Sequence, residues 1–585
     1  MRTNRGLIVV AALTVLLLAI VTGTATATTY YVAPTGNDSH PGTIDQPWQT
    51  IQHAADTLTA GDTVYIRSGT YNEHVRTMQS GNPTDGSIVF AAYPGETPVI
   101  DGTGVTEANN GVIVDQSYIK HIGLEICNWT ENGIWAENAG YLEIIDCVVH
   151  DVGYGIGVAD GTHDFALTRV EMHHFDYYGF DASPSGGADC YNGTFTDCSA
   201  HTWRDPELGH ECDGFALSHE GNQHDFVLIR CEAYTVGDGF VFGGRDITVN
   251  RCSAHDAEVG YKVWGDNTTL VNCLSYHNEN ANVELDWDEA PGTTTLQNCD
   301  FVDTQTYNIW IENSGDSLCM YNCILAGGDT LGLAFEERDA SNYQGDYNVF
   351  HNDVSDSAIV VGYEDEFSLD QIAAGAWTVY SGQDAHSLVA VDPPTQLFQN
   401  LAAWNFHLCE GSIVIDNGTA QGAPSEDFEG TPRPQGVGYD IGCYEFIASS
   451  TSSFDTGQGT YPSIAGVHNG TITPDGDLTV SRLYTYPCEG TGGHTEYVKI
   501  WNESGPIAEG NWTGYDGDWH NITLNVVLYE SETYNYTIQT GSYPQIIHAP
   551  SNEVEVTEGT ITCTEFVDVN GIKHEGWIPA IRLGS

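Results

Sequence analysis

A short β-strand pattern recurs along the middle of the chain. Segments such as YLEIIDCVVHD, DFVLIRCEAYT and DITVNRCSAHD return every two to three dozen residues from position 141 onward. Each alternates apolar and polar residues and then turns at a polar residue, which is typical of a strand that ends in a bend. A second set, including DGFAL, DGFVF and VGYKV, lies between them. Repeated short strands without helical periodicity predict a parallel β-helix, in which each rung buries its inward side chains by stacking on the next.

Cysteine occupies the same position in most of these rungs. We expect these side chains to form a ladder inside the β-helix. Disulfides between neighbouring rungs are the alternative, because adjacent strands lie only about 4.8 Å apart. No CxxC pair with a partnering histidine exists, so the spacing does not predict a zinc site. Cys488 and Cys563 stand alone in the last segment and are expected to form a disulfide. The ladder positions are Cys147, Cys198, Cys231, Cys252, Cys273, Cys299 and Cys323, with Val170 in one rung.

The chain is strongly acidic. It holds 17 Lys and Arg against 81 Asp and Glu, a formal net charge of −64. Such a surface repels phosphate backbones and acidic lipid headgroups, which disfavours nucleic-acid and membrane-surface partners. A hydrophobic content of 41% is nevertheless sufficient for a folded chain. The acidic charge and the scarcity of lysine are typical of proteins adapted to high salt, where screening removes the self-repulsion.

The first residues predict export. Residues 1–27 contain Arg2 and Arg5, an apolar run and the small residues before position 28, which together are typical of a signal peptide. No second apolar run follows, so we expect no membrane span in a secreted or cell-surface protein. Sequons that crowd one C-terminal segment, at Asn511, Asn521 and Asn535, are the expected glycosylation sites.

Two segments carry a resemblance to a known superfamily. Residues 30–75, beginning YYVAPTGNDS, resemble the N-terminal cap of secreted right-handed parallel β-helix proteins of the pectate-lyase-like superfamily, and residues 405–446 resemble its closing segment. The resemblance implies a right-handed β-helix over 28–446. Residues 447–459 are a Ser/Thr/Gly linker, and the alternating strands of 460–585 predict an accessory β-sandwich. The predicted fold class is all-β.

One outward-facing row of the second strand set contains a rare lysine. In this row two inward residues flank each outward one, and the outward residues should form a stripe along the β-helix. Lys262 is one of only four lysines in the chain. The stripe and its surroundings contain candidate contacts for a polysaccharide or cell-surface glycan, with tryptophans that suit sugar rings. The row is Trp135, Gly157, Asp181, Ala216, Val241, Lys262, Glu284 and Trp310, and the candidate substrate-binding residues are Trp135, Asp181, Arg245, Trp264, Glu284 and Trp310.

The stretch from Cys212 to Asp266 resembles the core of family 9 polysaccharide lyases. The turns DGF and GDGFV and the strand GYKVWG correspond to acidic turns that bind Ca²⁺ and to a strand that carries a lysine base. The resemblance therefore implies Asp213 and Asp238 as calcium ligands and Lys262 as the catalytic base. Gly237 and Val241 stand where that family has two more aspartates. Help would have to come from carbonyls, from water or from the neighbouring loop, which contains Asp205, Glu207, His210, Glu211 and Glu220.

The function implied by this resemblance is calcium-assisted β-elimination on a uronate-containing polysaccharide. The structural alternative is an ion pair between Lys262 and Glu284 on a solvated face. This alternative predicts a non-catalytic glycan-binding or S-layer-associated protein of the cell surface. A third reading is a glycoside hydrolase that uses Asp181, Asp213 and Asp238 as its carboxylates.

Overall fold

The structure is a computed structural model. It divides into two compact units, residues 1–446 and 447–585. It describes residues 27–184, 187–204, 212–217, 223–285, 292–312, 315–327, 331–336, 340–351, 357–362, 365–390, 397–447, 453–460, 463–488, 492–502, 505–514 and 519–584. The expected signal peptide and the five loop residues named above lie outside the described residues, apart from Ala27.

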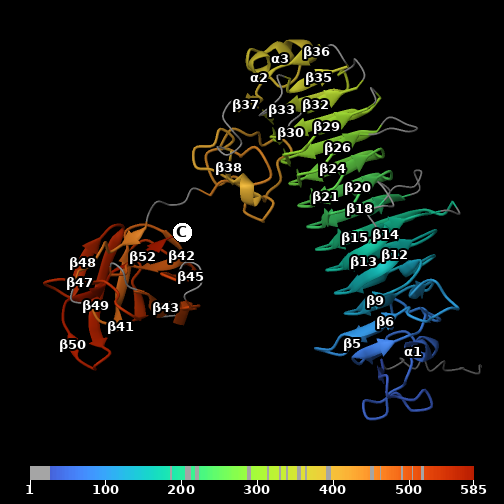
Figure 1. Cartoon of the computed structure of the whole chain (residues 1–585), viewed down its shortest axis with the longest axis horizontal. Coiled ribbons are helices and arrows are strands. Elements are labelled where there is room, and N and C mark those ends of the chain that lie inside the picture. Colours follow the sequence, from blue (N-terminus) through green and yellow to red (C-terminus); the bar gives the residue numbers. More distant parts are fainter. Residues whose placement is uncertain are drawn as a thin grey trace, which may run out of the picture. The chain divides into compact units, whose positions relative to one another are not determined.

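The first unit is a right-handed parallel β-helix of about 11 turns, with its strands stacked rung upon rung (Figure 1). All neighbours in its first sheet are parallel, as in Val227 of one strand beside Thr248 of the next. The order of this 13-stranded sheet is β1 (Thr29–Val32), β2 (Thr63–Ile66), β5 (Ile88–Ala92), β8 (Ile119–Ile122), β11 (Leu142–Ile145), β13 (His163–Thr168), β15 (Cys190–Thr196), β18 (Gln223–Ile229), β21 (Arg245–Asn250), β24 (Asp266–Val271), β27 (Thr293–Gln297), β30 (Ser317–Tyr321) and β33 (Tyr343–Asp346).

Two further strand columns complete each rung, and the long strands β12 (Val148–Val158) and β14 (Glu171–Ala182) run through both. One column contains β3 (Gly69–Tyr71), β6 (Pro98–Asp101), β9 (Glu125–Cys127), β16 (Ser199–His201), β19 (Glu232–Tyr234), β22 (Ser253–His255), β25 (Leu274–Tyr276), β28 (Asp300–Val302), β31 (Ile324–Ala326), β34 (Val349–Phe350) and β37 (Leu388–Val389). The other contains β4 (Val75–Arg76), β7 (Val112–Val114), β10 (Asn132–Ala136), β17 (Asp213–Leu217), β20 (Asp238–Phe242), β23 (Val259–Val263), β26 (Ala281–Leu285), β29 (Tyr307–Ile311), β32 (Leu331–Phe335) and β35 (Ile359–Val361), and β36 (Asp365–Phe367) pairs with β35 in antiparallel direction.

The corners of the rungs are residues in the left-handed backbone conformation. The polar residue that precedes each ladder position has a positive φ, for example 54° at Asp146, 56° at Asp197 and 53° at Arg230. Asp and Asn tolerate this conformation better than most residues. The predicted bend at a polar residue is therefore confirmed, and its repetition keeps successive rungs in register.

The cysteine ladder lies in the core of the β-helix. Its members are almost fully buried, and none of the 15 cysteines, all of which lie in the described residues, forms a disulfide. The prediction of a disulfide between Cys488 and Cys563 is therefore wrong. Cys563 lies on a sandwich strand where its sulfur faces Nδ1 of His468 at 3.9 Å, whereas Cys488 lies in a separate segment.

Short segments close the two ends of the first unit. Helix α1 (Ile51–Thr57) buries Ile51 and Ala54 at the N-terminal end. Helices α2 (Leu369–Ala373) and α3 (Ala376–Ser381) bury Ile372 and Trp377 at the other end. Residues 397–446, with β38 (Phe398–Asn400), η3 (Leu401–Ala403) and β39 (Asn405–Leu408), then pack Phe398 and Phe406 with the outer side of β25, β28 and β31. We call residues 397–446 the closing segment.

The second unit consists of antiparallel strands around its own core, consistent with the predicted β-sandwich. One sheet has the order β40 (Phe454–Asp455), β52 (Ile581–Gly584), β42 (Leu478–Thr485), β45 (Asn521–Leu528). The other has the order β44 (Gly505–Asn511), β43 (Thr495–Asn502), β46 (Tyr534–Thr540), β41 (Gly466–Pro474), β49 (Gly559–Asp568), β48 (Glu553–Val556), with β50 (Lys573–His574) beside β49; β47 (Ile546–His548) pairs with β51 (Trp577–Pro579).

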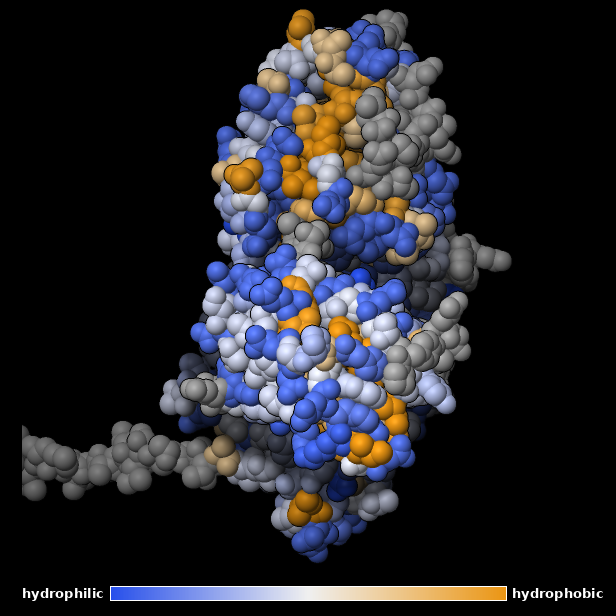
Figure 2. Space-filling model, turned by 90° about the vertical axis from the view of Figure 1, so that its left-hand side faces the viewer, coloured by the Kyte–Doolittle hydropathy of each residue, from blue (hydrophilic) through white to orange (hydrophobic). Residues whose placement is uncertain are grey.

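The surface is mostly hydrophilic on the face that Figure 2 presents, with hydrophobic residues confined to limited patches. This distribution fits the acidic composition. Within the described part of the chain, every helix is too short or too polar to cross a membrane.

Candidate functional site

The outward row predicted from the sequence is a single column in the structure. Successive strands place Trp135 beside Gly157, Asp181 beside Ala216, Val241 beside Lys262, and Glu284 beside Trp310. Lys262 and Glu284 are themselves register partners on β23 and β26. We call this row, from Trp135 to Trp310, the lysine column.

Lys262 lies between two carboxylates. Its Nζ is 3.1 Å from Oε1 of Glu284 and 3.7 Å from Oδ2 of Asp238. Both acids are largely buried, Glu284 at 4% exposure and Asp238 at 9%, whereas Lys262 is half-buried. Because screening by water is weak at such sites, the attraction between these charges is stronger than in ordinary surface pairs.

Asp213 adds a further acid beside this lysine. Burial raises its pKa well above the usual range, and the neighbouring charge of Asp238 raises it further, while a hydrogen bond from the Asp238 backbone and the charge of Lys262 oppose these effects. Asp181 lies close enough to contribute to the same shift. The result is a recessed group of carboxylates with one ammonium among them.

Glycines allow the rungs to approach each other at this site. A Cβ on Gly214 would lie 2.6 Å from the carbonyl oxygen of Gly239, and one on Gly239 would lie 2.7 Å from that of Gly260. The inward residue after each glycine forms a stack of rings, with Phe215 and Phe240 5.1 Å apart between centroids. The DGF pattern therefore combines a close approach of neighbouring rungs at its glycine with a stack of aromatic rings in the core.

A cavity of about 390 Å³ lies along the same column beyond Glu284. Trp310 lines it together with Tyr307, Leu331 and Phe335, and Glu336 is among its polar residues. The rings of Tyr307 and Trp310 are stacked at 5.3 Å. An apolar wall beside a polar edge suits one face of a sugar ring.

The remaining sequence-predicted contacts lie away from Lys262. Trp135, at the other end of the lysine column, covers Gly157, and Trp264 packs its indole against Gly243. Arg245 lies on β21 in the first sheet and pairs with Asp246 at 3.3 Å, so the structure does not bring it into the column.

The predicted glycosylation sites all lie in the second unit. Asn511 ends β44 and is exposed, whereas Asn521 and Asn535 are half-buried on β45 and β46.

The sequence alone did not lead us to a second outward column. It lies on the strand column that contains β9, β16, β19, β22 and β25. Here the rings of His150 and His173 stack at 4.8 Å, those of His173 and His201 at 5.4 Å, and the stack continues through Tyr234 and His255. We call the run from Cys127 through these rings to Tyr276 the histidine column. Its signal is present in the sequence, because VVH, EMH and SAH end on the same position of the repeat.

Comparison with known proteins finds a family match within the first unit. Residues 30–259 match the model described as "Pel9A-like, right handed beta helix region". Residues 30–259 are a Pel9A-like right-handed β-helix region.

Relatives of this Pel9A-like region include two named pectate lyases. "Pectate lyase PEL9" of Emericella nidulans is 31% identical over 33% of the chain and 44% of its own length, and "Pectate lyase L" of Paenibacillus polymyxa is 25% identical over 53% and 71%. The chain therefore covers less than half of the first relative. The crystal structure of pectate lyase Pel9A covers 73% of this chain and 98% of its own, at 14% identity and a TM-score of 0.43. The Pel9A-like match contains Asp213 and Asp238 and ends at Val259, before Lys262.

Proposed function

We propose that this protein is an extracellular polysaccharide lyase-like enzyme that cleaves a uronate-containing chain by β-elimination. The observation that carries the proposal is the position of Lys262 in a recessed acidic site, in register with a tryptophan-lined cavity. The likeness to two pectate lyases supports the substrate class.

In this reaction Lys262 removes the proton next to the uronate carboxylate. The electron pair forms a carbon–carbon double bond, the glycosidic carbon–oxygen bond breaks, and the departing oxygen takes up a proton from the solvent. Trp310 and Tyr307 would hold a neighbouring sugar ring in the cavity. The site residues thus supply a base and a platform along one column.

The acids beside Lys262 suit Ca²⁺ by their chemistry but supply only part of the oxygen ligands that it needs. Asp213, Asp238 and Asp181 supply hard oxygen donors of the kind that Ca²⁺ prefers, and the raised pKa of Asp213 reflects a buried pair of carboxylates that a cation would relieve. Gly237 and Val241 contribute no side-chain ligand, so carbonyls or water would complete the six to eight oxygens usually required. When bound, Ca²⁺ would neutralise the substrate carboxylate and acidify the adjacent proton.

The ion pairs of Lys262 favour a second candidate function. Glu284 at 3.1 Å and Asp238 at 3.7 Å both stabilise the ammonium form, which cannot act as a base. A permanently charged Lys262 would instead bind the carboxylates of an acidic glycan without cleaving it. This candidate is a non-catalytic glycan-binding protein of the cell surface.

One experiment separates the two functions. The exported protein is incubated with pectate and related polyuronates, with Ca²⁺ or with a chelator, and the ultraviolet absorbance of unsaturated products is followed. Calcium-dependent absorbance supports the lyase. Co-sedimentation with the polymer in the absence of any product would support the binding protein, and neither product nor binding would refute both.

A further inference from the structure

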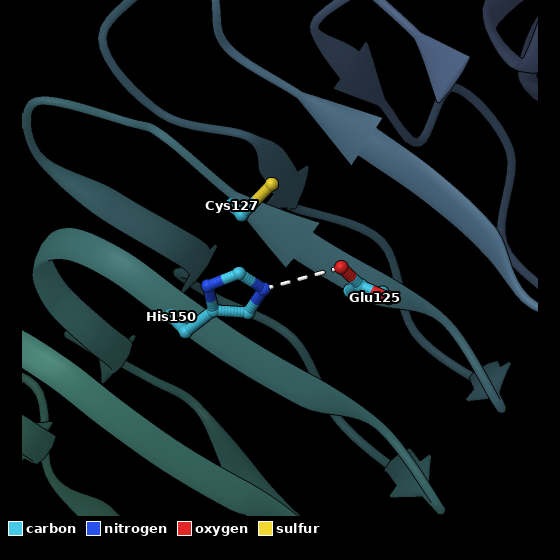
Figure 3. A group of neighbouring side chains, drawn as sticks. All are labelled: Glu125, Cys127 and His150. Carbon is cyan, nitrogen blue, oxygen red and sulfur yellow. Dashed lines mark hydrogen bonds and ion pairs between the residues drawn. The ribbon is translucent and has the colours of Figure 1, made fainter.

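Three potential metal ligands meet at the N-terminal end of the histidine column. Glu125 and Cys127 lie on β9, and His150 lies on the next rung in β12, where it is the register partner of Cys127 (Figure 3). One carboxylate oxygen, the sulfur and one ring nitrogen all lie within 4.8 Å of one another. The group is well away in sequence from Lys262 and lies on a different strand column.

The side chains around this group orient its ligands. His150 donates from Nδ1 to Oδ2 of Asp151 at 2.7 Å, and its Nε2 faces Oε1 of Glu125 at 3.2 Å. With the proton on Nδ1, the carboxylate of Asp151 holds the ring in the tautomer that presents a bare Nε2. A carboxylate behind a histidine is the usual outer partner in zinc sites.

The thiol is oriented as well. Asn128 donates to the sulfur of Cys127 at 3.3 Å and to Oδ1 of Asp101 at 3.0 Å. Asp101 is the register partner of Cys127 on the preceding rung. The group therefore lies in a negative environment that attracts a cation, although Cys127 itself is only 5% exposed.

The donor set selects the class of metal. Ca²⁺ and Mg²⁺ prefer oxygen ligands, whereas a thiolate together with an imidazole suits Zn²⁺ and other borderline ions. Zinc takes sulfur at about 2.3 Å and nitrogen at about 2.0–2.1 Å, so small side-chain rotations would bring these ligands together. A water molecule or Asp101 would fill the fourth tetrahedral position.

The same column contains two matched sites without the thiol. His201 faces Glu171 at 3.2 Å, and His255 faces Glu232 at 3.3 Å, each one rung after its glutamate. The position that holds Cys127 in the first site holds His173 in the second and Tyr234 in the third. Among the described residues, only the site with cysteine brings three ligand atoms within 4.8 Å.

We propose that Glu125, Cys127 and His150 form a binding site for a divalent transition metal of the zinc type. The metal connects β9 to β12 and so fastens two consecutive rungs near the N-terminal end. Binding releases the proton of the Cys127 thiol, because the thiolate is the ligand. The site is independent of the proposed lyase chemistry.

Cobalt titration of the full-length protein tests this site. Co²⁺ replaces Zn²⁺ and reports a thiolate ligand by its near-ultraviolet charge-transfer band. We expect one equivalent to produce the band and Zn²⁺ to abolish it. Cys127→Ser should remove the band, and His150→Gln should weaken Co²⁺ binding at least about 10-fold. The matched control His255→Gln should leave the titration unchanged.

A band of equal strength in Cys127→Ser would place the metal on another cysteine and overturn the proposal, as would the absence of a band in the wild-type protein. Thermal unfolding provides a second readout. Zn²⁺ should raise the unfolding temperature of the wild-type protein and of His255→Gln, but not that of Cys127→Ser. An equal rise in all three would also contradict the site.

Discussion

The lysine column and the histidine column are built by the same stacking of rungs, yet they offer different chemistry. In the first, buried acids surround Lys262, and the donors are oxygens. In the second, half-buried imidazoles alternate with glutamates, and one rung adds a thiol. The comparison shows that register decides which side chains meet, while the residue at each outward position decides what they bind. Two columns of one β-helix can therefore act independently.

The largest effect is expected at the lysine column. Lys262→Ala removes the proposed base and should lower the rate of unsaturated-product formation by about 10²- to 10⁴-fold, the usual contribution of a general base. The measurement is the initial rate on pectate with Ca²⁺, after circular dichroism has shown an intact fold.

Lys120 provides the matched control for this substitution. It pairs with Glu143 at 2.7 Å on the neighbouring rung of the first sheet, just as Lys262 pairs with Glu284. Lys120→Ala should keep the wild-type rate. If both variants were equally active, Lys262 would be no more than a surface ion pair.

The next effect concerns a buried acid, Asp300, on the rung that follows Tyr276, the last residue of the histidine column. Asp300 follows Glu232, Ser253 and Leu274 along one line of strand positions, but the closing segment buries it completely. Burial raises its pKa to about 7, although the backbone N–H and the thiol of Cys443 both donate to it. Glu232 shows the opposite shift, because a hydrogen bond with His255 lowers its pKa despite burial.

This pKa gives stability a defined pH dependence. The folded state favours the protonated form of Asp300. The contribution of this group to the free energy of unfolding is therefore fully present below about pH 4 and is lost as the pH rises through about 7. A shift of about three pKa units corresponds to about 4 kcal/mol. Urea unfolding from pH 4 to 8 should show this loss in the wild-type protein relative to Asp300→Asn. Parallel curves would mean that water reaches Asp300 beneath the closing segment.

Features that recur from rung to rung could be predicted from the sequence, whereas contacts that occur only once could not. The rungs, the bends and the position of Lys262 recur in one strand register, so pattern alone places Trp135, Lys262 and Trp310 in one column. The meeting of Cys127 with His150 has a weaker signal, because EIC and VVH end on the same position of the repeat but cysteine takes the place of histidine in the first of these rungs. The cover over Asp300 depends on a segment more than a hundred residues later, and such non-local packing leaves no local pattern.

Calcium provides a test that distinguishes the two columns. Asp238→Asn removes a carboxylate from the lysine column and should raise the Ca²⁺ concentration needed for half-maximal activity at least about 10-fold, since even an outer partner of a metal site contributes this much. Asp256→Asn is the control, because Asp256 pairs with His255, which belongs to the histidine column, and with His277. An equal increase of this Ca²⁺ concentration in both variants would indicate a general effect of the lost charge and would contradict a specific calcium site at Asp238.

The smallest effect is expected at the cavity beyond Glu284. Trp310→Ala removes an aromatic wall whose stacking contributes about 0.5–1.5 kcal/mol, so KM for the polysaccharide should rise roughly 2- to 12-fold while kcat is maintained. Trp135→Ala is the matched variant, at the far end of the same column, and should leave KM unchanged if the substrate occupies only the end near Lys262. Equal increases of KM in both variants would mean that the substrate binds along the whole lysine column. A loss of kcat in Trp310→Ala alone would mean that this ring positions the reacting sugar.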